Sequence, residues 1–125
     1  MMPASFSSAA YVPENLIAGE ADDLIGKKIT LIAGQNLKRG AVIGKITASG
    51  KYTLSTSAAN DGSQTPDLIL AQDCDATLAD QQAVAYKRGD FVAESVILGA
   101  GHTVASIEEG LRSKGIFFIS SIGGA

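Results

Sequence analysis

Asp61-Gly62-Ser63-Gln64-Thr65-Pro66-Asp67-Leu68-Ile69-Leu70-Ala71 places a polar turn directly before a short apolar run. Gly62 supplies the positive φ of a tight turn, and Pro66 favours an extended conformation outside a central ladder position. Residues 68–71 are therefore predicted to form a buried β-strand. No group of catalytic residues surrounds this stretch, so it indicates a structural element of the fold rather than an active site.

The composition around this segment favours one small domain of short strands. The chain has 125 residues, 14 glycines, no tryptophan and only 18% charged residues, which is typical of a turn-rich β protein with a single core. No window holds eighteen consecutive apolar residues, so we expect no membrane span. The N-terminus lacks the pattern of a signal peptide, and we expect synthesis in the cytoplasm.

A second strand pattern lies upstream of the turn. Residues 51–57 alternate, so Tyr52 shares one face with every second residue, whereas Ser55 lies on the opposite face, which is predicted to be wet. Residues 41–47 form another strand candidate, and the connection Ala48-Ser49-Gly50 is short enough for an antiparallel hairpin.

Downstream, Val84 and Tyr86 alternate in the same way. The cluster Lys87-Arg88-Gly89-Asp90 is predicted to turn the chain into a further strand at residues 91–98. Near the end, Ile116-Phe117-Phe118-Ile119 is apolar on both faces, which predicts a strand covered on both sides.

One helix is predicted before that last strand. Its apolar face holds Val104, Ile107 and Leu111. Ser106 and Glu109 have the spacing of a capping box, and Gly115 is placed to stop the helix. Gly110 costs about 1 kcal/mol relative to alanine, so packing must hold the helix in place. The predicted fold is mainly β (α+β): a compact, barrel-like single domain of short antiparallel strands with one short C-terminal helix.

Residues 1–15 differ from the rest of the chain because they are small, polar and almost uncharged. Their prolines prevent a continuous helix, and they have too little apolar surface to offset the entropy of ordering. We therefore expect a flexible, extended N-terminal arm at 1–15 and a β-rich domain at 16–125. A frayed terminus is the simpler interpretation, yet the arm carries the adhesive residues Phe6, Tyr11, Val12 and Pro13.

The sequence offers no constellation for catalysis, metal binding or cofactor binding. His102 is the only histidine, and no nucleophile or orienting acid can be assigned to it. Cys74, the only cysteine, lies between two aspartates that raise the pKa of its thiol, which favours a small buried hydrophobe. Basic residues come as scattered pairs, and the interval between Lys51 and Lys87 is acidic, so we expect no direct nucleic-acid contact.

One alternative from another class remains open. Glycine before a strand with a second glycine, as at residues 40–46, is also how lipoyl and biotinyl carrier domains begin, and Lys51 at a hairpin end would then be the modified lysine. Against this alternative, Lys51 lies between Gly50 and Tyr52, outside the tripeptide that such carriers present.

The chain resembles the lambda-type phage head decoration proteins from residues 16–20 to residues 111–117. The resemblance is carried by the segments 34–46, 50–52, 61–71 and 88–91 and by the closing helix with its Gly-Ile-Phe. Cys74 departs from it mildly, because the pattern favours a small aliphatic residue there. The resemblance implies a structural protein, not an enzyme, that binds the major capsid protein on the outer surface of the virion.

The resemblance also implies the mode of attachment. Homotrimers are expected at three-fold positions of an expanded head, where they brace it against packaged DNA. The arm would then bind the capsid, and Ile116, Phe117, Phe118 and Ile119 are the candidate trimer interface.

Overall fold

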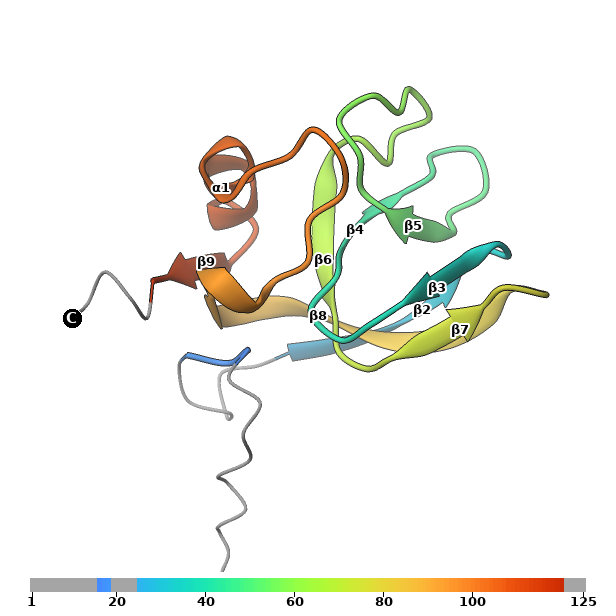
Figure 1. Cartoon of the computed structure of the whole chain (residues 1–125), viewed down its shortest axis with the longest axis horizontal. Coiled ribbons are helices and arrows are strands. Elements are labelled where there is room, and N and C mark those ends of the chain that lie inside the picture. Colours follow the sequence, from blue (N-terminus) through green and yellow to red (C-terminus); the bar gives the residue numbers. More distant parts are fainter. Residues whose placement is uncertain (1–15, 19–24, 121–125) are drawn as a thin grey trace, which may run out of the picture.

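The computed structural model of the chain describes residues 16–18 and 25–120. Within these residues, a mixed β-barrel is formed in the order β2-β5-β4-β6-β8 and closes through pairing of β8 with β2 (Figure 1). The strands are β2 (Ile25–Leu31), β4 (Val42–Lys45), β5 (Tyr52–Leu54), β6 (Pro66–Leu70) and β8 (Gln81–Val92). The mainly β, barrel-like prediction is confirmed, although the β2–β5 pairing is parallel.

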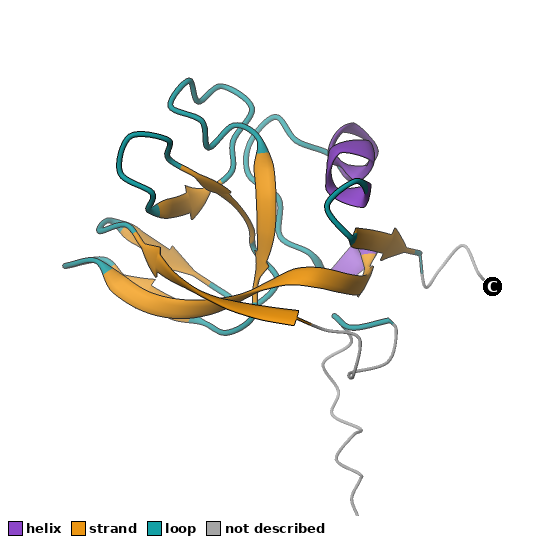
Figure 2. Ribbon diagram, turned by 180° about the vertical axis from the view of Figure 1, so that it is seen from behind, coloured by secondary structure: helices purple, strands orange, loops and turns teal. Residues whose placement is uncertain are grey.

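Smaller elements flank the barrel. A parallel strand, β9 (Ile116–Ile119), extends the sheet beyond β8, and β3 (Gln35–Leu37) pairs with β7 (Cys74–Ala76) in a separate antiparallel ribbon. The short 3₁₀-helix η3 (Ala93–Ser95) and the helix α1 (Val104–Arg112) lie at the same end of the molecule as β9 (Figure 2).

The segment 61–71 folds as its sequence predicts. Gly62 has φ +105°, and a Cβ there would meet Thr47 Oγ1, so both the turn and its close packing require glycine. Pro66 is the first residue of β6, where its missing N–H removes no bond from the middle of a ladder. The hairpin prediction is also confirmed, because β4 and β5 pair antiparallel with Ile43 opposite Leu54.

Two apolar cores share the wall formed by β4 and β6. Because alternate side chains of a strand face opposite ways, Ile43 and Leu70 point into the barrel, whereas Val42 and Ile69 point into a second core. The second core also contains Leu111 from the helix. The helix is thus held to the barrel by packing, as Gly110 within it requires.

The helix forms where it is predicted, but its cap is different. Ile107 and Leu111 are buried as expected. The capping box is made by Thr103 and Ser106, each side chain accepting a hydrogen bond from the other's backbone N–H, not by Ser106 and Glu109. Thr103 is extended (φ −130°) and therefore places its hydroxyl over the first turn, which leaves Glu109 to pair with Arg112.

The predicted turn at residues 87–90 is wrong. β8 continues through it without interruption from Gln81 to Val92, and residues 93–98 form η3 and a single bridge from Ile97 to Ala41 rather than a strand. The strand changes partners at Gly89 (φ +145°): residues 81–88 pair with β2, and residues 89–92 pair with β9. The glycine thus bends one strand between two neighbours.

The residues around Val84 alternate between two faces, but the larger apolar side chains are not the ones that face the barrel core. Ala83 and Ala85 point into the barrel core, whereas Val84 is exposed and Tyr86 packs partly against the second core. Ala83 pairs with Ile29 and Ala85 pairs with Leu70, so at this position a small side chain lies beside a large one in the same core.

Candidate binding surface

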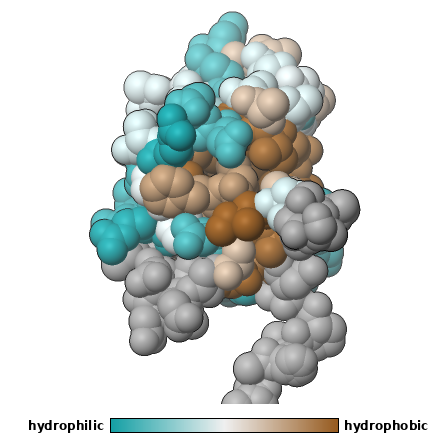
Figure 3. Space-filling view, turned by 90° about the vertical axis from the view of Figure 1, so that its left-hand side faces the viewer, coloured by the Kyte–Doolittle hydropathy of each residue, from teal (hydrophilic) through white to brown (hydrophobic). Residues whose placement is uncertain are grey.

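The strand β9 carries apolar side chains on both faces, but the described residues cover only one of them. Ile116 is fully buried and Phe118 packs against the second core, whereas Phe117 and Ile119 are 42% and 47% exposed. The prediction of a strand covered on both sides is therefore wrong for the single subunit. Figure 3 shows apolar surface across the middle of the face on which β9 and α1 lie. These two side chains are the exposed part of the candidate trimer interface.

The described segment 16–18 lies along the other edge of the same part of β8. Leu16 is fully buried in the second core, and its carbonyl accepts a hydrogen bond from Val92 N at 2.6 Å. Ala18 N donates to Asp90 O at 3.0 Å. Leu16 is therefore held beside β8 by both packing and a main-chain hydrogen bond. The predicted arm residues Phe6, Tyr11, Val12 and Pro13 lie outside the described residues.

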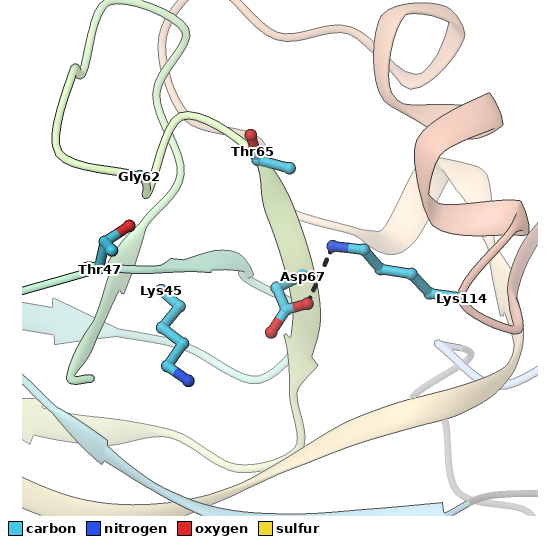
Figure 4. A pocket seen from close by; sticks show the side chains of 6 residues that line it. All are labelled: Lys45, Thr47, Gly62, Thr65, Asp67 and Lys114. Carbon is cyan, nitrogen blue, oxygen red and sulfur yellow. Dashed lines mark hydrogen bonds and ion pairs between the residues drawn. The ribbon is translucent and has the colours of Figure 1, made fainter.

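A polar group at the mouth of the barrel joins β6 to the end of the helix. Tyr52 Oη donates to Asp67 Oδ2 at 2.9 Å, and Lys114 Nζ lies 2.9 Å from Asp67 Oδ1 (Figure 4). Burial alone would raise the pKa of Asp67, but the hydrogen bonds from Lys114 and Tyr52 together hold it below its ordinary value. Burial, and then the bond to Asp67, raise the pKa of Tyr52. This group fixes the turn after α1 against the barrel.

The lone histidine has a serine beside it that sequence reasoning did not identify. Ser55 Oγ lies 3.1 Å from His102 Nε2, but this serine is fully buried, contrary to its predicted wet face, and donates its proton to Ser63 O at 2.7 Å. Since that proton is already engaged, Ser55 accepts a hydrogen bond from Nε2–H. The pair holds the 55–63 loop against the 99–102 turn and presents no nucleophile. The sequence feature that could have indicated this contact is Gly99, because a Cβ there would collide with Ser55 O.

Cys74 is buried, as its sequence context predicts. Burial, with a smaller effect of Asp75, raises the pKa of its thiol and disfavours a reactive thiolate. Lys51 Nζ lies 2.6 Å from Asp80 Oδ2, so the side chain that a carrier domain would modify is held in an ion pair. Nothing in this geometry favours the carrier alternative.

The aspartates of the acidic interval are engaged separately in local structure. Asp73 accepts from Arg39 N, Asp75 from Thr77 N and Asp80 from Ala33 N. Across residues 16–18 and 25–120, no group of three or more histidine, cysteine, aspartate or glutamate side chains could hold a metal ion. In the same ranges, no helix is long and apolar enough to cross a membrane.

The small mixed barrel, its exposed apolar strand and its locally engaged polar groups are the features of a structural binding protein. The family model described as Bacteriophage lambda head decoration protein D matches residues 6–116, which is most of the chain. The protein therefore belongs to this family of phage head decoration proteins, which are structural components of the capsid. Curated proteins gave no match.

Proposed function

We propose that the protein decorates the outside of an expanded phage head as a homotrimer at three-fold positions and braces the shell against packaged DNA. The observation that carries the proposal is the exposed apolar face of β9. Within the described residues, β9 is also the last strand of its sheet. Family membership supplies the capsid as the partner.

The apolar face of β9 supports self-association. Phe117 and Ile119 stand on one side of a strand whose other side is packed into the second core. Burial of apolar area contributes about 25 cal/mol per Å², so repeating this contact around a closed ring stabilises a domain with small cores. The trimer interface thus comprises residues 116–119, with Phe117 and Ile119 making the contacts.

Residues 1–15 form the arm of this proposal and residues 16–125 form the body. Leu16 is locked into the second core next to β8, so each arm starts from the same end of the subunit that carries β9. Three arms on one rigid trimer raise the effective concentration at the shell, and attachment is then much tighter than that of one arm. Each arm adds main-chain hydrogen bonds to a strand edge of the shell, with Phe6, Tyr11 and Val12 in pockets.

The oligomeric state is tested on decorated particles by cross-linking and, after release, by sedimentation. The wild-type ladder should end at three subunits, and the double variant Phe117→Ser, Ile119→Ser should yield monomers. Leu78→Ser is the matched control, because Leu78 is 96% exposed but lies at the distant β7–β8 tip. A stable dimer, or a trimer that the double variant leaves intact, contradicts the proposed interface.

The arm is tested by deletion of residues 2–14. The shortened protein should retain its circular dichroism and melting curve but fail to protect heads from rupture. Wild-type protection by the shortened protein would place the attachment on the globular body instead.

A further inference from the structure

The barrel wall is nearly open between β2 and β5. β2 pairs with β8 along its whole length, but only Leu31 pairs with β5, opposite Tyr52. Ile32 N donates to Tyr52 O at 2.9 Å, so the backbone of residue 32 faces β5. Since peptide groups alternate in direction along a strand, those of Thr30 and Lys28 face the same side.

The opposite side of the pairing agrees with this assignment. Lys28 lies opposite Val84 of β8, and Val84 O accepts from Ala71 N, which lies on the side away from β2. The Lys28–Val84 pair is therefore a non-hydrogen-bonded pair of the ladder. The Leu31–Tyr52 bridge is completed by a bond from Tyr52 N to Thr30 O, but over residues 25–120 no backbone group bonds the N–H or C=O of Lys28 or the N–H of Thr30. This part of β2 is a free strand edge inside an otherwise closed barrel.

Lysines surround this opening. A hollow of about 320 Å³ is lined by Lys27, Lys28, Thr30, Lys45 and Tyr52, among others. None of the three lysines forms an ion pair with a described residue, whereas Lys38, Lys51 and Lys114 do. We call the edge of residues 27–30 and the lysines that face it the β2 seam.

The carboxylate near the seam, that of Asp67, does not neutralise the positive charge of its lysines. Asp67 is already engaged by Lys114 and by the Tyr52 hydroxyl. Lys45 also lines the adjoining hollow of about 280 Å³ that contains Asp67 and Lys114 (Figure 4). The charge of Lys27 also acts on Asp67, but this one carboxylate is bonded by Lys114 and does not balance three lysines. The seam therefore combines free main-chain hydrogen-bonding groups with ammonium groups that form no ion pair with a described residue.

We propose that the β2 seam receives an extended segment of the shell protein that carries aspartate or glutamate. The segment adds a strand beside Lys28 and Thr30, and its carboxylates lie among Lys27, Lys28 and Lys45. This inference rests on the proposed function, because it names a second attachment point on the same shell. The arm of another copy fits less well, since Glu14 is its only acidic residue.

Hydrogen exchange on particles tests the main-chain contact directly. Wild-type protein is compared free and bound to expanded heads that lack it, and peptides covering residues 26–31 are followed by mass spectrometry. Binding should slow exchange of these amides at least about tenfold, as new hydrogen bonds require. Decorated heads without slowing in residues 26–31 would overturn the seam inference while leaving the proposed function standing.

The free protein serves as the internal control. Protection of the Lys28 and Thr30 amides in the free oligomer would assign the seam to a contact between copies and would also overturn the shell segment as its occupant. Protection that appears with DNA fragments in place of heads would assign the seam to phosphate, with the same consequence.

Charge reversal tests the acidic character of the partner. Lys27→Glu, Lys45→Glu should weaken binding to heads by about tenfold or more, with a smaller effect at high salt. Lys87→Glu is the matched control, because Lys87 is exposed on β8 outside the seam and forms no ion pair with any described residue. The neutral variant Lys27→Gln, Lys45→Gln retains the fold if reversal does not, and should give an intermediate loss. Equal binding by the seam variants and the Lys87 control would refute the proposal.

Discussion

Alanine substitutions at Gly110 and Gly44, neither of which has a positive φ, should change stability in opposite directions, because an added Cβ has free space at the first and none at the second. Gly110 is exposed within α1, and an added Cβ meets nothing within 4 Å. Gly110→Ala should therefore gain about 1 kcal/mol from helix propensity. Gly44 is buried in β4, and its Cβ would lie within 3 Å of three backbone atoms of Ser63.

Relieving that clash requires β4 and the 61–65 loop to separate. This movement stretches the buried hydrogen bond from Ser55 to Ser63 and costs about 1–3 kcal/mol or more. The two alanine variants should thus differ by roughly 2–4 kcal/mol in the free energy of unfolding.

Urea and thermal unfolding by circular dichroism, at one fixed protein concentration, measure this difference. Gly110→Ala should raise Tm by about 4 °C, as expected for a gain of 1 kcal/mol in a domain of this size. A Gly44→Ala variant as stable as the wild type would refute the close approach of β4 to Ser63. A destabilised Gly110→Ala variant would refute the open surface of the helix.

Four further outcomes follow from the polar groups. Because the pKa of Asp67 is lowered on folding, its contribution is present above the ordinary value of 3.8 and is lost as pH falls below it; an acid titration of wild type and Asp67→Asn should converge there. Because the pKa of Tyr52 is raised, its contribution is retained below the ordinary value of 10.0 and lost as pH rises well beyond it, and Tyr52→Phe should flatten the alkaline limb of the stability curve. Ser55→Ala should cost about 1–3 kcal/mol by urea unfolding, since Ser63 O loses its buried donor. His102→Ala should leave protection of heads unchanged in a rupture assay, and loss of protection with fold and assembly intact would show that the histidine acts directly.

The parts of the fold that local rules govern could be predicted from the sequence. The strand at Leu68, the hairpin into Tyr52 and the helical face at Leu111 each depend on residues a few positions apart, and all are present. The predicted turn at residues 87–90 failed because four polar or glycine residues also suit a surface strand whose edges are both paired. Pairing with β2 and β9, which are distant in the sequence, makes these residues part of a strand rather than a turn.

Of the candidate surface, the sequence indicated the apolar strand but not which side of it is free. Phe117 and Phe118 look alike in sequence, and only the position of the second core separates exposed from covered. The Ser55–His102 contact and the β2 seam were missed for the same reason. They depend on segments that are distant in the sequence and are brought together by the barrel.

The continuous strand β8 also bears on how the subunit responds to mechanical stress. Its 12 residues span roughly 40 Å, and it contributes Ala85 to the barrel core and Phe91 to the second core. In the proposed role, internal pressure stretches a head and the protein attached to it, and a protein made of two independently unfolding halves would fail at the weaker half. Because the one strand β8 contributes side chains to both cores, a force applied near β9 is transmitted to the barrel. The barrel core and the second core should then unfold together.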